Sequence, residues 1–251
     1  MRNERTYLLD FLGLNVVILV RIWIIAQVFR AAFRSASVET IDGLSLSNVI
    51  WMVGITQAVG ALIGNVELRV SEEVQDGSIA YLLARPISYV GYHYARFLGN
   101  AAALLPISIL SSSLVVWLLV GPIQISMHGA LAALLVMAGG ATLHFVICLL
   151  IGLLAFWFED ISAFGWIYQK LWILFGGMVL PLDIFPQQIR WVAELSPFPH
   201  LFHAAARLCV SFSTPRFMQI LAVQAIWLIL TGSALFLLQR RAASRLVLNG
   251  G

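Results

Sequence analysis

Charged side chains are scarce in this chain of 251 residues. Lys, Arg, Asp and Glu together make up 11% of it, whereas soluble globular domains carry about 25%. Hydrophobic residues make up 61%, and the mean hydropathy is +0.92. This balance excludes an ordinary water-soluble domain and predicts an integral membrane protein.

Lysine and cysteine are also nearly absent. Lys170 is the sole lysine, and no G-x-x-x-x-G-K-[ST] sequence occurs, so the phosphate-binding loop that ends in such a lysine cannot lie in this chain. The two cysteines, Cys148 and Cys209, fall at no metal-ligand spacing and are interpreted as buried, inert thiols. The net charge of +3 is too small to indicate nucleic-acid binding. We therefore expect no cofactor and no metal in this chain.

Long apolar runs are what the chain has in abundance. Gly43–Val66 and Phe97–Phe158 contain no Asp, Glu, Lys or Arg, and a helix of about 20 apolar residues can cross a bilayer. The longer run divides at the turn-forming sequence GPIQISMHG, residues 121–129. We predict an all-α polytopic membrane protein that forms a single domain over residues 1–251. Its six transmembrane helices are expected at about 8–33, 47–66, 97–119, 129–157, 162–181 and 217–239.

The distribution of arginine predicts the orientation. Six spans place both ends of the chain on the same side, and Lys and Arg near the ends of spans favour the cytoplasm. With both termini inside, eight arginines lie in cytoplasmic segments and four in outer segments. We therefore expect cytoplasmic N- and C-termini.

The segment 67–96 contains the sequence SEEVQDGSIAYLLARP, which starts at Ser71. We predict a short helix with Ser71 as its cap and acids in its first turn, where the helix dipole favours them. Gly77 bends the chain, and a second helical turn ends before Pro86, because the residue before a proline disfavours helix. This element is either an interfacial helix with a solvated acidic face or a docking surface for a soluble partner. Its apolar side chains are expected on one side: Ile79, Leu82 and Leu83.

The outer segment 183–212 contains two further short helical patterns. Gln187–Leu195 and His200–Cys209 are each about ten residues long, too short to cross a bilayer, and they are separated by Pro197 and Pro199. The length and the aromatic residues of the segment favour re-entrant or interfacial helices over an extracellular loop.

Two charged residues fall inside the predicted spans. Arg21 lies in the first span and Lys170 in the fifth, and a charge at the centre of a bilayer costs at least about 2.5 kcal/mol. Each side chain either lines a transport pathway or reaches the headgroups along its own apolar stem. The sequence leaves both alternatives open.

The residues after Glu72 follow a pattern found in a known family. EEVQDGSIAYLLARPISYVGYHYARFLG resembles the segment of bacterial ABC type-2 transporter permeases that reads roughly E-x-x-x-G-x-[IL]-x-x-L-L-x-[RK]-P-[IL]-S and then Y-x-x-x-[RK]-x-[IL]-G. LPLDIFPQQIRWVAELSPFPHLFHAAARL, residues 180–208, and the ending RRAASRLVLNGG are similar to other parts of that family. The resemblance covers nearly the whole chain. The matching positions are Glu73, Gly77, Ile79, Leu82, Leu83, Arg85, Pro86, Ile87, Ser88, Tyr92, Arg96 and Gly99.

The resemblance implies a half-transporter without its own motor. We expect the permease subunit of an ATP-driven exporter in a bacterial inner membrane, among membrane lipids, with an N-terminal elbow helix over Leu8–Asn15 and a cytoplasmic coupling helix. A separate ABC ATPase, in two copies, would bind ATP and magnesium, and a second permease chain, identical or homologous, would complete the path. The substrate cannot be read from the sequence. The residues expected to contact the ATPase are Glu72, Glu73, Asp76, Gly77, Leu82, Leu83, Arg85 and Pro86.

Two other classes of protein are weighed against this interpretation. A secondary transporter or channel would be expected to show inverted repeats or paired ionisable residues within its spans, and the sequence has no such pairing. An intramembrane enzyme is less well supported, because the pair Glu72–Glu73 lies outside the predicted spans and position 77 is Gly where an E-E-x-x-x-R protease signature needs Arg. Both alternatives would function without an ATPase.

Overall fold

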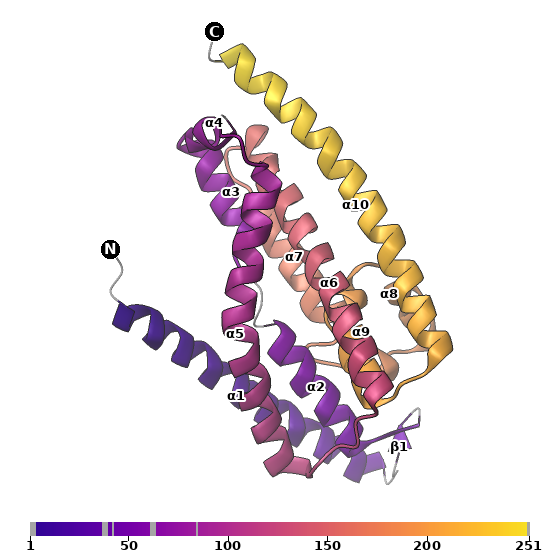
Figure 1. Cartoon of the computed structure of the whole chain (residues 1–251). Helices are drawn as coiled ribbons and strands as arrows, with labels where there is room; N and C mark the ends of the chain where they lie inside the picture. The colour runs from indigo at the N-terminus through magenta and orange to yellow at the C-terminus, as the bar shows by residue number, and fades with distance from the viewer. Residues whose placement is uncertain (1–3, 37–39, 42, 61–63, 84, 250–251) are drawn as a thin grey trace.

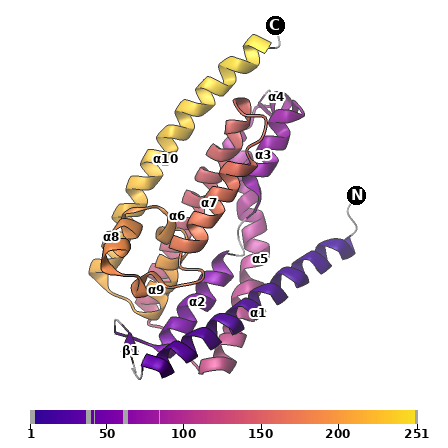
Figure 2. The same cartoon turned by 180° about the vertical axis from the view of Figure 1, so that it is seen from behind.

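The computed structural model describes residues 4–36, 40–41, 43–60, 64–83 and 85–249. This part of the chain forms an elongated helical bundle (Figures 1 and 2). The ten α-helices of the described residues are α1 (Glu4–Ala36), α2 (Leu46–Gly60), α3 (Val66–Gln75), α4 (Ser78–Leu83), α5 (Tyr89–Val120), α6 (Met127–Leu153), α7 (Ser162–Phe175), α8 (Gln187–Leu195), α9 (His203–Val210) and α10 (Thr214–Asn249).

Short elements connect these helices. A two-stranded antiparallel hairpin, β1 (Thr40–Ile41) and β2 (Leu44–Ser45), joins α1 to α2. Single 3₁₀ turns are η1 (Leu154–Phe156), η2 (Leu182–Ile184) and η3 (Phe198–His200). Residues 182–210, which comprise η2, α8, η3 and α9, are called the cap below. The cap lies away from the end of the bundle that carries α4 and the last turns of α10 (Figure 1).

Helix α6 lies at the centre of the bundle. It packs against α10, α9 and α3. In its most apolar stretch of 18 residues, 56% is buried, compared with 17% in the corresponding stretches of α5 and α10. Its central position follows from its sequence, because α6 carries no charged residue and has glycines where neighbours come close. The core around it includes the fully buried Leu143, Phe145 and Leu149.

Helices α1, α2 and α5 form the second part of the bundle. They contact one another in every pairwise combination and bury Ile22, Ile50 and Val116 between them. The outward faces of α5 and α10 stay apolar, as at Leu110 and Ile229, which are 71% and 67% exposed. Such faces suit contact with lipid tails or with another membrane subunit.

Within the described residues, four helices are long and apolar enough to cross a membrane: Asn15–Ser35, Tyr89–Val120, Met127–Phe156 and Thr214–Ala242. They overlap the predicted spans 8–33, 97–119, 129–157 and 217–239. The other two predicted spans, 47–66 and 162–181, contain shorter helices in their described parts, and residues 61–63 of the first lie outside the described residues. Helix α2 has 15 residues and α7 has 14, so each is about 22 Å long, less than the roughly 30 Å of a hydrocarbon core. Helix α7 ends early because Gly176 and Gly177 follow it, and Gly177 has φ +71°.

The elbow helix expected over Leu8–Asn15 is not a separate element. Helix α1 runs without interruption from Glu4 to Ala36, so the start of the chain and the first candidate span belong to one helix. Whether the first turns lie on the membrane surface stays a prediction.

A contact between α3 and α6 generates a first test. A Cβ atom at Gly152 of α6 would lie 2.6 Å from Cβ of Val70 and 2.9 Å from the carbonyl oxygen of Glu67, both on α3. Gly152→Ala should therefore lower the free energy of unfolding by about 1–3 kcal/mol, the usual cost of overpacking. Denaturation of the purified protein in detergent micelles measures the change.

The matched control is Gly232→Ala on α10, where a Cβ atom meets nothing within 4 Å. This variant should retain the stability of the parent protein or raise it by up to about 1 kcal/mol, because Ala favours a helix more than Gly does. Equal stability of the two variants would contradict close packing of α3 on α6.

Candidate functional site

Helices α3 and α4 form a helical corner at one end of the bundle (Figure 1). Helix α3 starts at Val66, after Asn65. The prediction that Ser71 is the first residue of the helix, its N-cap, is therefore wrong. Ser71 lies inside the helix, is buried, and accepts a hydrogen bond from Nε2 of Gln75. The missed signal is the apolar pair Val66 and Val70, which gives α3 a buried face one turn earlier than the acids. The bend predicted at Gly77 is present, with φ +76°, a conformation that favours glycine.

The outer surface of this corner carries most of the residues expected to contact an ATPase. Tyr81 is 67% exposed, and the guanidinium carbon of Arg85 lies 4.7 Å from its ring centroid. Leu82 is half-buried and packs against the main core, whereas Leu83, expected on the same side, is 44% exposed. The remaining predicted contact residues with exposed positions are Glu72, Asp76, Gly77 and Pro86.

Glu73 points into the protein instead of outward. Its Oε2 accepts hydrogen bonds from Oη of Tyr89 at 2.8 Å and from Nε2 of His93 at 3.0 Å. The side chain of Glu73 is 13% exposed and that of His93 is 2% exposed. Glu73 therefore joins α3 to the first turns of α5, and the sequence could not reveal this because the partners lie 16 and 20 positions away.

Asp76 stabilises the turn between α3 and α4. Its Oδ1 accepts a hydrogen bond from the backbone N–H of Ser78 at 2.8 Å, and hydrogen bonds from Ser78 hold the pKa of this exposed carboxyl below its ordinary value of 3.8. Asp76 is thus both exposed and part of the corner's own structure.

Glu67, in the first turn of α3, was not singled out from the sequence. Its side chain is only partly exposed, and its Oε2 is buried without a hydrogen-bond partner among the described residues. Burial raises its pKa above the ordinary value of 4.5, against the opposing effect of hydrogen bonds from its own backbone and from Cys148. The carboxyl group therefore reaches α6 and anchors α3 to it.

The two cations inside the predicted spans have different surroundings. Nη1 of Arg21 donates a long hydrogen bond of 3.4 Å to Oε1 of Gln57, and Nε2 of the buried Gln57 donates in turn to the carbonyl oxygen of Met178 at 2.9 Å. Lys170 is exposed, and its Nζ lies 5.2 Å from the ring centroid of Trp166, one turn earlier on α7. No ion pair with an acid involves Arg21 or Lys170 in the described ranges. The structure does not bring these two residues together.

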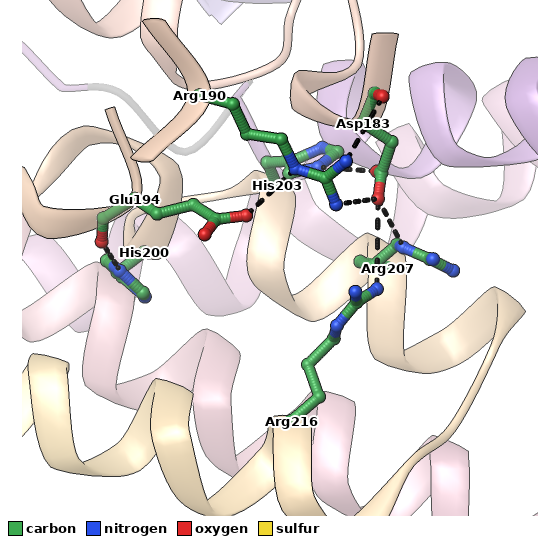
Figure 3. A network of polar contacts seen from close by, with 7 residues as sticks. All are labelled: Asp183, Arg190, Glu194, His200, His203, Arg207 and Arg216. Carbon is green, nitrogen blue, oxygen red and sulfur yellow. Dashed lines mark hydrogen bonds and ion pairs between the residues drawn. The ribbon is translucent and has the colours of Figure 1, made fainter. Parts of the chain in front are cut away.

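A buried carboxylate, Asp183, holds the cap together (Figure 3). Its side chain is 4% exposed, and its Oδ1 lies 3.0 Å from Nε of Arg207, 3.4 Å from Nη2 of Arg190 and 3.7 Å from Nη1 of Arg216. Its Oδ2 lies 3.4 Å from Nε2 of His203. One acid of η2 thereby gathers cations from α8, α9 and the first turn of α10.

The electrostatics explain why Asp183 can be buried. Burial alone would raise the pKa of this carboxyl, but the hydrogen bond with His203 and the positive charges of Arg207 and Arg190 hold it well below its usual range. The carboxylate is therefore ionised at physiological pH. Sequence reasoning missed the cluster because its members are separated by up to 33 positions. The only available signal was that Asp183 and Glu194 are the two acids among the arginines of the segment 183–216.

No group of three or more His, Cys, Asp or Glu residues in the described part of the chain could hold a metal ion. The clusters at both ends of the bundle consist of carboxylates with arginine, histidine and tyrosine. Their chemistry is that of ion pairs and hydrogen bonds.

Asp183→Asn should destabilise the protein strongly. It removes the negative charge that three arginines share, and breaking a buried ion pair from one side costs about 3–5 kcal/mol. Because the folded-state pKa of Asp183 is depressed, its stabilisation is present above the ordinary value of 3.8 and is lost only as the pH falls below it. The difference in unfolding free energy between the parent and the variant should therefore stay constant from about pH 6 to 8.

Glu194→Gln is the control for this test. The side chain of Glu194 is 42% exposed and pairs with Arg190 on the same helix, so its loss should cost about 0–1 kcal/mol. A loss of similar size in both variants would contradict the central role of Asp183.

Glu67→Gln should stabilise the protein at neutral pH. Because burial raises the folded-state pKa of Glu67, the folded state holds a proton that the unfolded state releases, and stability falls as the pH rises above 4.5. The amide carries no charge and avoids this loss. Thermal unfolding should show a gap in favour of the variant that widens as the pH rises from 4.5 to the folded-state pKa and stays constant above it.

Glu72→Gln, at an exposed position of the same helix, should shift stability by no more than about 0.5 kcal/mol. If the difference in stability between the parent protein and Glu67→Gln does not depend on pH, the burial of Glu67 is refuted.

Comparison with known families agrees with this architecture. A family model described as ABC-2 family transporter protein matches residues 16–250. Searches of curated proteins and of solved structures give no significant match. The matched region contains the α3–α4 corner and the cap, and four helices of its described part are long and apolar enough to cross a membrane. The chain therefore belongs to the ABC-2 family of transporter proteins and is a membrane protein, a permease subunit of an ABC transporter.

Proposed function

We propose that this chain is the permease half of an ATP-driven exporter and that its ATPase docks on the α3–α4 corner. The observation that carries the proposal is the form of this corner. It presents Glu72, Tyr81 and Arg85 to the surroundings, and its inner side is fixed to the bundle by Glu73. A surface that is both exposed and firmly anchored suits the transmission of force.

The anchoring contacts reach two helices and the loop before a third. Glu73 connects the corner to α5, Val70 packs against Gly152 of α6, and Gln75 donates a hydrogen bond to the carbonyl oxygen of Glu159, in the loop before α7. Displacement of the corner by an ATPase would therefore move the ends of α5, α6 and α7 together. Of the acids expected to contact the ATPase, Glu72 suits docking, whereas Glu73 suits transmission of the movement.

What the chain does not contain supports the rest of the proposed assembly. Without a phosphate-binding loop in its sequence, ATP and magnesium belong on two copies of a separate ATPase. The apolar outer faces of α5 and α10 support contact with lipids and with a second permease chain. In this assembly the ends of the chain and the α3–α4 corner face the cytoplasm of a bacterium, and the cap faces outward. Arg21, bonded to Gln57 on α2, would lie beside the path.

Charge reversal at Glu72 tests the docking. Glu72→Lys places a cation on the exposed corner without touching the Glu73 contacts, and like-charge or mismatched contacts at an interface cost several kcal/mol. The affinity-tagged variant is expressed together with its ATPase, the subunit that carries the G-x-x-x-x-G-K-[ST] loop, and purified. The amount of ATPase that co-purifies should be at least about tenfold lower than with the parent permease. ATP-dependent export should fall with it, while the amount of inserted permease stays unchanged.

Arg34→Glu serves as the control, because it reverses an exposed charge at the end of α1 that lies away from the corner. It should leave ATPase retention unchanged. Normal retention and transport in Glu72→Lys would overturn docking at this corner. Transport by the purified permease alone, without any ATPase, would show a secondary transporter or channel instead.

A further inference from the structure

A hollow opens in the cap beside the Asp183 cluster. It has a volume of about 600 Å³ and is lined by side chains of α8 and of the first turns of α10, among them Arg190, Trp191 and Arg216. A smaller cavity of about 60 Å³ shares the linings Asp183, Glu194, Arg216 and Gln219 and reaches Arg207. The two spaces thus border the same group of charges, whose members Figure 3 shows.

The charges around these spaces do not balance. Three arginines, Arg190, Arg207 and Arg216, face two carboxylates, Asp183 and Glu194, which leaves one positive charge in excess. The buried Nη1 of Arg207 has no hydrogen-bond partner among the described residues. The sole ion pair of Arg216 within the described chain is the long 3.7 Å contact with Asp183. Donor groups and positive charge are therefore available to a further anion.

We propose that the hollow and the adjoining smaller cavity together bind the phosphate group of an amphiphilic molecule. Guanidinium groups present donors in a planar fork that matches phosphate oxygens, and two of the three arginines come from different helices that border the opening. A water molecule needs about 10–15 Å³ of such space, so the 60 Å³ cavity accommodates a group of about four to six atoms. A phosphate group has this size.

The outer side of α8 accounts for the apolar part of the ligand. Ile189, Val192 and Leu195 are 46%, 53% and 59% exposed, whereas Arg190 and Glu194 of the same helix line the hollow. Trp191, 58% exposed, lies on the rim, a position that tryptophan favours where apolar and wet surroundings meet. A headgroup in the hollow would thus leave its tails beside an apolar helix face.

Binding to the purified permease in neutral detergent tests the proposal without an ATPase, so its result is independent of the proposed docking at α3–α4. The probes are dioctanoyl phosphatidylglycerol, inorganic phosphate and dioctanoylglycerol, which has the same tails without phosphate. Tryptophan fluorescence and thermal unfolding report binding. Dioctanoyl phosphatidylglycerol should bind and raise the melting temperature, and dioctanoylglycerol should do neither.

Arg216→Gln should weaken the binding of dioctanoyl phosphatidylglycerol about tenfold or more, because it removes charge-assisted hydrogen bonds. Arg34→Gln, which removes an exposed cation outside the cap, should bind like the parent. If Arg216→Gln does not fold, Gln219→Glu adds a negative charge at an exposed position of the same rim and should weaken binding in the same way.

Comparing the three probes also identifies the source of the phosphate. Inorganic phosphate could bind the parent protein as tightly as dioctanoyl phosphatidylglycerol does and bind Arg216→Gln more weakly. In that case the phosphate group alone is recognised, and the site exists for free phosphate. Weaker binding of inorganic phosphate identifies the lipid headgroup. Absence of phosphatidylglycerol binding, equal binding of dioctanoylglycerol, or unchanged affinity in Arg216→Gln and Gln219→Glu would overturn the site.

Discussion

The cost of removing a charge from water governs this structure. In an apolar chain each charged group away from solvent needs an opposite charge or hydrogen bonds from the protein itself. Asp183 meets this requirement with three arginines and a histidine, and Glu73 meets it with Tyr89 and His93. Because each cluster takes its members from several helices, satisfying the charges also fixes the positions of those helices. The few polar residues of the chain therefore determine how its apolar helices are joined.

Much of the backbone could be predicted, because it depends on local pattern. The predicted helix Gln187–Leu195 has the bounds of α8, and Pro197 and Pro199 separate it from α9, which starts three residues after the expected His200. Gly77 and Pro86 likewise mark the corner and the end of α4, because the conformational limits of glycine and proline act on adjacent residues. Four of the six predicted spans overlap long apolar helices of the described residues, because their apolar runs exceed the length that a bilayer requires.

The candidate sites could be predicted only in part, because they depend on contacts between distant residues. The acids at positions 72 and 73 are neighbours in the sequence, yet Glu72 is exposed and Glu73 is turned toward α5. A helix rotates each residue by about 100°, and only the packing of α3 decides which acid faces inward. The predicted span 162–181 extends beyond the end of α7 at Phe175 for a similar reason. Hydropathy does not register that Gly176 and Gly177 end a helix inside an apolar run.

Helix α6 connects the two ends of the molecule. Near its last turn Gly152 receives α3, and near its middle Gly140 lies under the carbonyl oxygens of His200 and Leu201, where a Cβ atom would come within 2.6 Å of each. Gln224 of α10 completes this junction, since its Nε2 donates to the carbonyl oxygens of Val136 and His200. A close-packed helix with fixed contacts at both places resists compression and bending. Movement of the α3–α4 corner would therefore reach the cap through α6 as displacement of a rigid rod, and the cap would respond as the unit that Asp183 holds together.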